Sequence, residues 1–217
     1  MSQPVPPAGA SPSPNKEFAH PASEEELKRA ADALEAHGIH VLAAENGIEA
    51  KRLALEMVPA GSEVSTGASI TLETIGVLAE IEQSGRYNAV RPRLRSMDRA
   101  TQAREMRKLG NVPDYMLGSV HALTEDGSLL IASLTGSQLS PYANGAGKVI
   151  LVVGHQKIVP NITQGFRRIY DYVYPLEDAH AQRDFGMRSG VNKILIINQE
   201  IVPGRITVVL VREALGF

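Results

Sequence analysis

The sequence predicts an α/β fold in which helices cover both faces of a mostly parallel sheet. Three apolar runs, at 149–153, 194–197 and 206–211, carry this prediction, because none of them alternates regularly between apolar and polar residues. Such runs are typical of strands that are buried on both faces, as in parallel α/β sheets. Helical segments at about 161–173 and 175–185 fall between the first two runs, where a crossover connection is required.

The earlier part of the chain alternates between helix and strand. Ser23 and Glu26 have the spacing of a capping box, which predicts a helix that begins there and ends at Gly38. Further elements are indicated by caps, turns and β-type runs: a strand at 39–42, a helix from Asn46 to Met57, a strand ending near Val64, a helix starting near Leu72, and strands at 115–117 and 129–132.

The composition limits the possible functions. The chain has 217 residues, 43 % of them hydrophobic, which suits one domain with a substantial core. A net charge of −2 gives no general attraction to nucleic acid or to anionic membranes. With no Cys, the chain offers no iron–sulfur ligands, and no His pair has the spacing of a helical zinc motif, so we expect no metal site. No apolar run reaches the ~20 residues of a membrane span, and no signal peptide is evident, so a cytoplasmic location is expected.

The sequence predicts a leader followed by a single domain. Residues 1–20 are rich in Pro, Ser and Ala and are expected to form a flexible leader, with 21–217 as one domain. A locally basic stretch at 91–108 has two interpretations. It is either a solvated helix near 97–109 that ends at Gly110, or a contact surface for an anionic substrate or an acidic partner.

The first candidate site is the segment STGASIT at 65–71, between a strand and a helix. Small residues and hydroxyls in this position allow close approach of an anion, and a helix start adds a favourable dipole. The same residues also form ordinary turns and caps. The candidate ligand-binding residues are Ser65, Thr66, Gly67, Ser69 and Thr71.

The second candidate site is the segment GSVHALTEDGS at 118–128. Asp126 and Gly127 predict a tight turn, with Glu125 at the tip of a strand and His121 four residues before it. A carboxylate there would act as nucleophile or general base with an imidazole as proton partner, or it would simply be a solvated turn residue.

The third candidate site follows the apolar run at 149–153. Lys157 lies just beyond this run, and Asn198 follows the run at 194–197 in the same way. Ligands of parallel α/β sheets bind at the carboxyl ends of strands, so both are candidate ligand-binding residues, although Lys157 has an alternative as a surface lysine.

Several of these segments together resemble one family. VSTGASITLETIG at 64–76, TEDGSL at 124–129, VVGHQKIVPNITQGFRRI at 152–169, VNKILIINQE at 191–200 and GRITVVLVREALGF at 204–217 occur in the order seen in the LUD domain, the lactate utilisation family. The resemblance is to lactate utilisation protein C-like members. It implies a Rossmann-like sheet of the fold group of CoA transferases, ribose phosphate isomerases and glucosamine phosphate deaminases.

The resemblance also implies a function. It suggests participation in oxidation of lactate to pyruvate beside a partner that carries iron–sulfur clusters, with a small carboxylate or phosphorylated ligand bound at the strand ends. Within this fold group, the similarity of TEDG at 124–127 to the Ser-Glu-Asn-Gly of CoA transferases marks Glu125 as the first candidate for a reactive residue, with His121 beside it. The alternatives are a non-catalytic assembly subunit of a redox complex, and a transferase or isomerase that uses Glu125.

Overall fold

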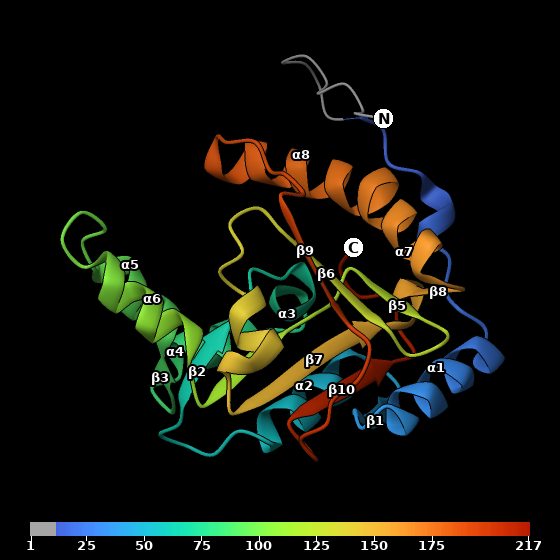
Figure 1. The fold of residues 1–217 in the computed structure, drawn as a ribbon, viewed down its shortest axis with the longest axis horizontal. Helices are drawn as coiled ribbons and strands as arrows, with labels where there is room; N and C mark the ends of the chain where they lie inside the picture. Colours follow the sequence, from blue (N-terminus) through green and yellow to red (C-terminus); the bar gives the residue numbers. More distant parts are fainter. Residues whose placement is uncertain (1–11) are drawn as a thin grey trace.

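The centre of the molecule is a six-stranded sheet in which all neighbouring strands are parallel (Figure 1). The computed structural model describes residues 12–217. The strands of this main sheet, in spatial order, are β1 (His40–Ala44), β10 (Ile206–Val211), β7 (Lys148–Gly154), β4 (Tyr115–Gly118), β2 (Glu63–Thr66) and β3 (Asn88–Ala89). The predicted α/β fold with a mostly parallel, Rossmann-like sheet is confirmed.

A second, smaller sheet packs against the first, and the sequence did not predict it. Its order is β8 (Ile158–Val159), β5 (Ala122–Thr124), β6 (Leu129–Ser133) and β9 (Lys193–Ile197). Strand β5 is parallel to β8 and antiparallel to β6, and β6 is antiparallel to β9.

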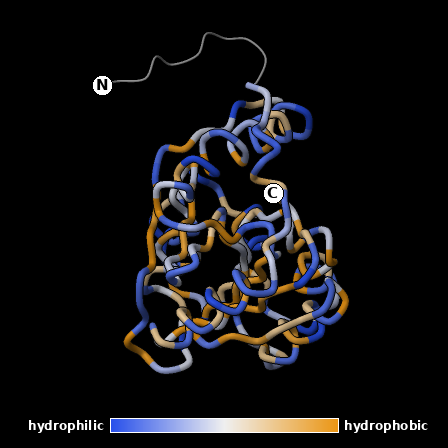
Figure 2. Tube along the Cα trace, turned by 90° about the vertical axis from the view of Figure 1, so that its right-hand side faces the viewer, coloured by the Kyte–Doolittle hydropathy of each residue, from blue (hydrophilic) through white to orange (hydrophobic). Residues whose placement is uncertain are grey.

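The buried hydrophobic side chains show which helices and sheets pack against each other. Helices α2 (Gly47–Glu56), α3 (Ile70–Thr74) and α4 (Val77–Gln83) pack on one face of the main sheet. The other face is buried by α1 (Glu24–Ala36) and by the second sheet. The outer face of the second sheet carries α7 (Ile162–Arg168) and the π-helical turn Ile169–Val173, which continues into α8 (Tyr174–Phe185). In Figure 2, hydrophobic stretches of the trace cross the interior between hydrophilic outer segments.

Local signals in the sequence account for the first two helices. Ser23 and Glu26 form the predicted capping box on α1, and the side chain of Asn46 accepts two backbone hydrogen bonds at the start of α2. Gly38 follows α1 with φ +75°, and a Cβ there would lie 2.2 Å from the carbonyl oxygen of Glu200. Both the backbone conformation and the close approach therefore require glycine.

The interpretation of 194–197 as a strand of the parallel sheet is wrong. This run is β9, an edge strand of the second sheet, so α7 and α8 do not connect neighbouring strands of one parallel sheet. The apolar run has another cause. Ile194 and Ile196 face the core under α7, whereas Leu195 and Ile197 face the core shared with the main sheet. Burial on both faces removes the polar alternation whatever the strand direction.

The basic helix expected near 97–109, ending at Gly110, is present but begins only at Ala103 and ends at Asn111. The structure has two helices, α5 (Val90–Ser96) and α6 (Ala103–Asn111), separated by a loop. Asp98 explains the interruption, because its carboxylate accepts hydrogen bonds from the backbone of Ala100 and from the hydroxyl of Thr101. Such local side-chain bonds compete with helical ones.

The expected leader at 1–20 falls partly outside the described residues. Within the described part, Lys16–Ala19 form a 3₁₀ helix, the backbone of Asn15 bonds to the carbonyl of Asp171, and Phe18 packs on the core beneath α7. The packed region therefore extends to residues before 21. In residues 12–217 there is no helix with the length and apolarity that crossing a membrane requires.

Candidate functional site

A cavity of about 270 Å³ lies where the carboxyl ends of β2, β4 and β7 meet the second sheet and the helices above it. Its floor is formed by the loop at 68–71, residues 119–121 and Lys157, one wall by residues 131–135 of β6 and the following loop, and its roof by α8 and residues 187–191. The carboxyl edge of a parallel sheet is the usual place for a ligand in α/β proteins.

Lys157 supplies the buried amine of this cavity. Its side chain is only 2 % exposed, and Nζ donates hydrogen bonds to Thr71 Oγ1 at 2.8 Å and to Ser119 Oγ at 3.0 Å. No carboxylate in residues 12–217 pairs with it, although most buried lysines have such a partner. Burial, and secondarily the charge of Arg168, lowers the pKa of Lys157 well below its usual value.

His121 lies in the same cavity as a neutral ring. Its Nδ1 accepts a hydrogen bond from the backbone N–H of Ala132 at 3.1 Å, which leaves the ring proton on Nε2. Burial, with the nearby charges of Lys157 and Arg168, lowers the pKa of His121 to about 3. At neutral pH the ring is therefore a hydrogen-bond donor through Nε2 and not a source of positive charge.

Arg168 fixes the backbone beside Lys157 and at His121. Its side chain is fully buried, donates to the backbone carbonyls of His121 and Gln156, and lies over the ring of Tyr172 at 5.2 Å. Burial lowers its pKa to about 10, so the guanidinium stays charged at neutral pH. It therefore fixes the backbone on both sides of the cavity floor and adds positive potential beneath it.

The segment at 65–71 is only partly a cavity segment. Ser69 and Thr71 line the cavity, where Ser69 caps α3 and Thr71 contacts Lys157. Ser65 and Thr66 are buried within β2 and do not line it. Gly67 packs on the hydroxyl of Tyr142, which a Cβ would approach to 2.8 Å. The role of glycine here is thus close packing.

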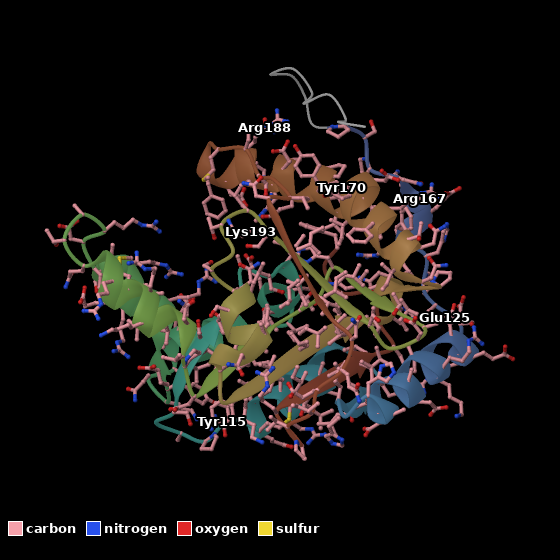
Figure 3. All side chains as sticks on the ribbon, in the orientation of Figure 1. Tyr115, Glu125, Arg167, Tyr170, Arg188 and Lys193 are labelled. Atoms are coloured by element: carbon pink, nitrogen blue, oxygen red, sulfur yellow. The ribbon has the colours of Figure 1, made fainter. Side chains whose placement is uncertain are left out.

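The structure does not bring Glu125 to the cavity. Glu125 lies in the predicted turn after β5, and its Oε2 accepts a hydrogen bond from Arg29 Nε of α1 at 2.6 Å. Figure 3 shows Glu125 beside α1, and it is not among the residues that line the cavity. His121 and Glu125 therefore face different surroundings and do not form a pair. Asn198 accepts a hydrogen bond from Ser128, at the same turn and also outside the cavity lining.

Sequence reasoning missed Ser119 and Arg168. Ser119 directly follows β4, the strand beside β7, so its place at the carboxyl edge was a usable signal. Arg168 lies on the same helical face as the buried Gly165, Ile169 and Val173, and a charge on such a face indicates a buried role. In residues 12–217, no group of three or more His, Asp and Glu side chains is arranged to hold a metal ion.

Comparison with known proteins agrees with the fold. The family model described as the LUD domain matches residues 27–211. A crystal structure of a DUF162 family protein from Deinococcus radiodurans is similar at a TM-score of 0.54 and 13 % identity, covering 88 % of this chain and 99 % of that chain. At that identity the likeness concerns the fold alone. A comparison with curated proteins found no match. Because the family model covers most of its length, the chain belongs to the LUD domain family.

Proposed function

We propose that the cavity above Lys157 binds a small carboxylate or phosphorylated ligand, and that the protein serves lactate utilisation in this way. The observation that supports it most strongly is the Lys157 amine, which is buried at the cavity floor without a carboxylate partner among the described residues. An anionic ligand would supply the missing partner. Charge-assisted hydrogen bonds in a site with little water are stronger than neutral ones.

The other polar groups of the floor suit the same ligand. His121 presents a neutral Nε2–H donor, and Ser69 adds a hydroxyl, whereas Ile131, Val173 and Phe185 supply apolar walls. A hydroxy acid such as lactate, with a carboxylate, a hydroxyl and a methyl group, matches this mixture of donors and apolar surface. Such a combination of mostly apolar lining and few convergent polar groups is typical of small-molecule sites.

Replacing Lys157 with Met is expected to weaken lactate and pyruvate binding by about 10- to 100-fold, because a hydrogen bond to a charged group is worth about 1.5–3 kcal/mol. Isothermal titration calorimetry with lactate, pyruvate, a sugar phosphate and a CoA ester measures this and identifies the ligand class. Lys108→Met, on the exposed side of α6, is the matched control and should bind like the wild type. Thermal unfolding verifies that each variant is folded. Unchanged affinity in folded Lys157→Met would place the ligand elsewhere.

We also propose Glu125 as a candidate reactive residue, which lies outside the cavity. Its Oε2 accepts a hydrogen bond from Arg29 Nε at 2.6 Å. In the same calorimetric series, Glu125→Gln should leave binding unchanged, because Glu125 does not line the cavity. A loss of turnover with retained binding would assign Glu125 to the chemistry of a transferase or isomerase.

We also propose that the protein acts in the cytoplasm, beside a partner that carries iron–sulfur clusters. Oxidation of lactate releases electrons, and this chain has no Cys with which to hold a cluster. The contact surface that fits an acidic partner is formed by Arg99, Arg104 and Arg107, which are exposed and make no ion pair within residues 12–217. Arg93 and Arg95, by contrast, pair with Glu63 and Glu82.

Reversing the charge of Arg99, Arg104 and Arg107 to Glu is expected to abolish co-purification of such a partner without altering lactate affinity. Rim charges act mainly on encounter and orientation, so the loss should be greatest at low salt. Pull-down from cells grown on lactate, with Arg52→Glu on α2 as a single-charge control, measures it. Full retention of the partner by the triple variant would exclude this surface.

A further inference from the structure

Two hydrogen bonds from the Lys157 amine leave one position of its nitrogen without a partner. The hydroxyl of Thr71 donates to the carbonyl of Leu215 at 3.1 Å, and that of Ser119 donates to the carbonyl of Val152 at 2.6 Å. A carbonyl oxygen can only accept, so the single proton of each hydroxyl is committed. Both hydroxyls therefore act toward Lys157 as acceptors and take up two N–H bonds.

Two N–H donors and one lone pair are what a neutral amine has. With its two N–H groups held by Thr71 and Ser119, the remaining position of Nζ is directed away from both hydroxyls, and Lys157 lines the cavity. In the neutral amine of the free protein this position is the lone pair; in the ammonium, which a bound carboxylate favours, it is the third N–H, which donates to that carboxylate. The two hydroxyls thus fix the orientation of a nucleophile at the cavity floor.

The electrostatic surroundings favour the same protonation state. No carboxylate of residues 12–217 pairs with Lys157, and the nearest cation, Arg168, opposes a second positive charge. Burial acts in the same direction, so the pKa of the amine is well below its usual value. A desolvated lysine beside another cation is the usual arrangement by which proteins obtain an amine nucleophile at neutral pH.

We propose that Lys157 condenses with the carbonyl carbon of an α-keto acid to form a Schiff base in this cavity. The Nζ lone pair attacks the carbonyl carbon and gives a carbinolamine. The two protons of the amine nitrogen pass to the former carbonyl oxygen, which leaves as water, and a C=N bond replaces C=O. No electrons are exchanged with a third component. His121 Nε2–H, in the same cavity, is the donor that polarises the carbonyl oxygen. This inference rests on the proposed function. It adds that, among the ligands of the cavity, α-keto acids react with Lys157.

Reductive trapping tests the proposal on the full chain. The protein is incubated with pyruvate and sodium cyanoborohydride at pH 7, digested and analysed by mass spectrometry. The expected result is one reduced adduct per chain, on Lys157, and none with lactate, which has no keto group. Lys157→Arg, which keeps a cation but not a primary amine, should give no adduct, whereas Lys108→Met should label like the wild type.

The pH dependence adds a readout that a purely structural lysine does not give. An exposed amine with a pKa near 10.4 is neutral in only about one molecule in 2,500 at pH 7, so its labelling rises about tenfold per pH unit. Labelling of Lys157 should instead begin at lower pH and rise less steeply, because burial and the charge of Arg168 lower the pKa of its amine.

Two results would overturn the proposal. One is the absence of an adduct on Lys157 at pyruvate concentrations that calorimetry shows to saturate the cavity, and the other is labelling spread over the exposed lysines with the steep pH dependence. If lactate and pyruvate bind but pyruvate is not trapped, the proposed function stands and the Schiff base does not. If neither ligand binds, both fail.

Discussion

Replacing Arg205 with Met is expected to lower the free energy of unfolding by about 3–5 kcal/mol, the range found when one partner of a buried ion pair is removed. The side chains of Arg205 and Glu200 are each only 8 % exposed and are joined at 2.6 Å. Arg205 also donates to the carbonyls of Tyr142 and Ala143, at 2.9 and 3.0 Å, in the π-helical turn Pro141–Gly145. The variant leaves the Glu200 carboxylate with the backbone N–H of Val202 but without its cationic partner, and it removes the Arg205 donor from two carbonyls.

Urea unfolding followed by circular dichroism measures this loss. The matched control is Arg183→Met, because Arg183 forms an exposed pair with Asp184 on α8 and such pairs contribute about 0–1 kcal/mol. The double variant Arg205→Met/Glu200→Met should lose less than the sum of the single variants, since it leaves no unpaired charge. A change within about 0.5 kcal/mol for Arg205→Met would contradict this view of how the turn is attached to the sheet.

The stability of the protein should decrease as the pH falls from about 6.5 toward 3 because of His121. The folded-state pKa of His121 is about 3, lowered by burial, against 6.5 in the unfolded chain. Between these values the unfolded state binds a proton that the folded state does not, so acid favours unfolding. Each pKa unit corresponds to about 1.4 kcal/mol, which bounds the loss at roughly 5 kcal/mol, less whatever cavity water contributes by solvating the ring.

A comparison of variants isolates this contribution from that of the carboxylates. The stability advantage of the wild type over His121→Asn should be largest at pH 7 and should shrink by up to about 3 kcal/mol by pH 4. His20→Asn, at an exposed position before α1, should give a profile parallel to the wild type. Parallel profiles for His121→Asn as well would show that His121 is solvated in both states.

Prediction from the sequence succeeded where the cause is local. The capping box of Ser23 and Glu26 and the cap at Asn46 involve residues two or three positions apart, and the structure has both. The second sheet was missed because β9 has the same apolar run as a parallel strand, and only its long-range partners reveal its direction. The loop at 97–102 was missed because the expected helix near 97–109 began within it, whereas the bonds that Asp98 accepts from Ala100 and Thr101 keep this segment out of α6.

The same distinction applies to the candidate site. Lys157 was recognised from its place after a buried strand, but its partner Thr71 is 86 residues away along the chain, a contact that no spacing rule indicates. His121 and Glu125 were paired because alternate residues of one strand share a face. The structure places His121 before β5 and Glu125 in the turn after it, and they face the cavity and α1 respectively.

A crystal structure of the protein soaked in lactate tests most directly whether the cavity above Lys157 is the ligand site. Lactate is expected in the cavity, with its carboxylate within hydrogen-bond distance of Lys157 Nζ and its hydroxyl near His121 Nε2. A fully occupied lactate at the turn beside Glu125 and Arg29, with the cavity above Lys157 holding only water, would contradict it.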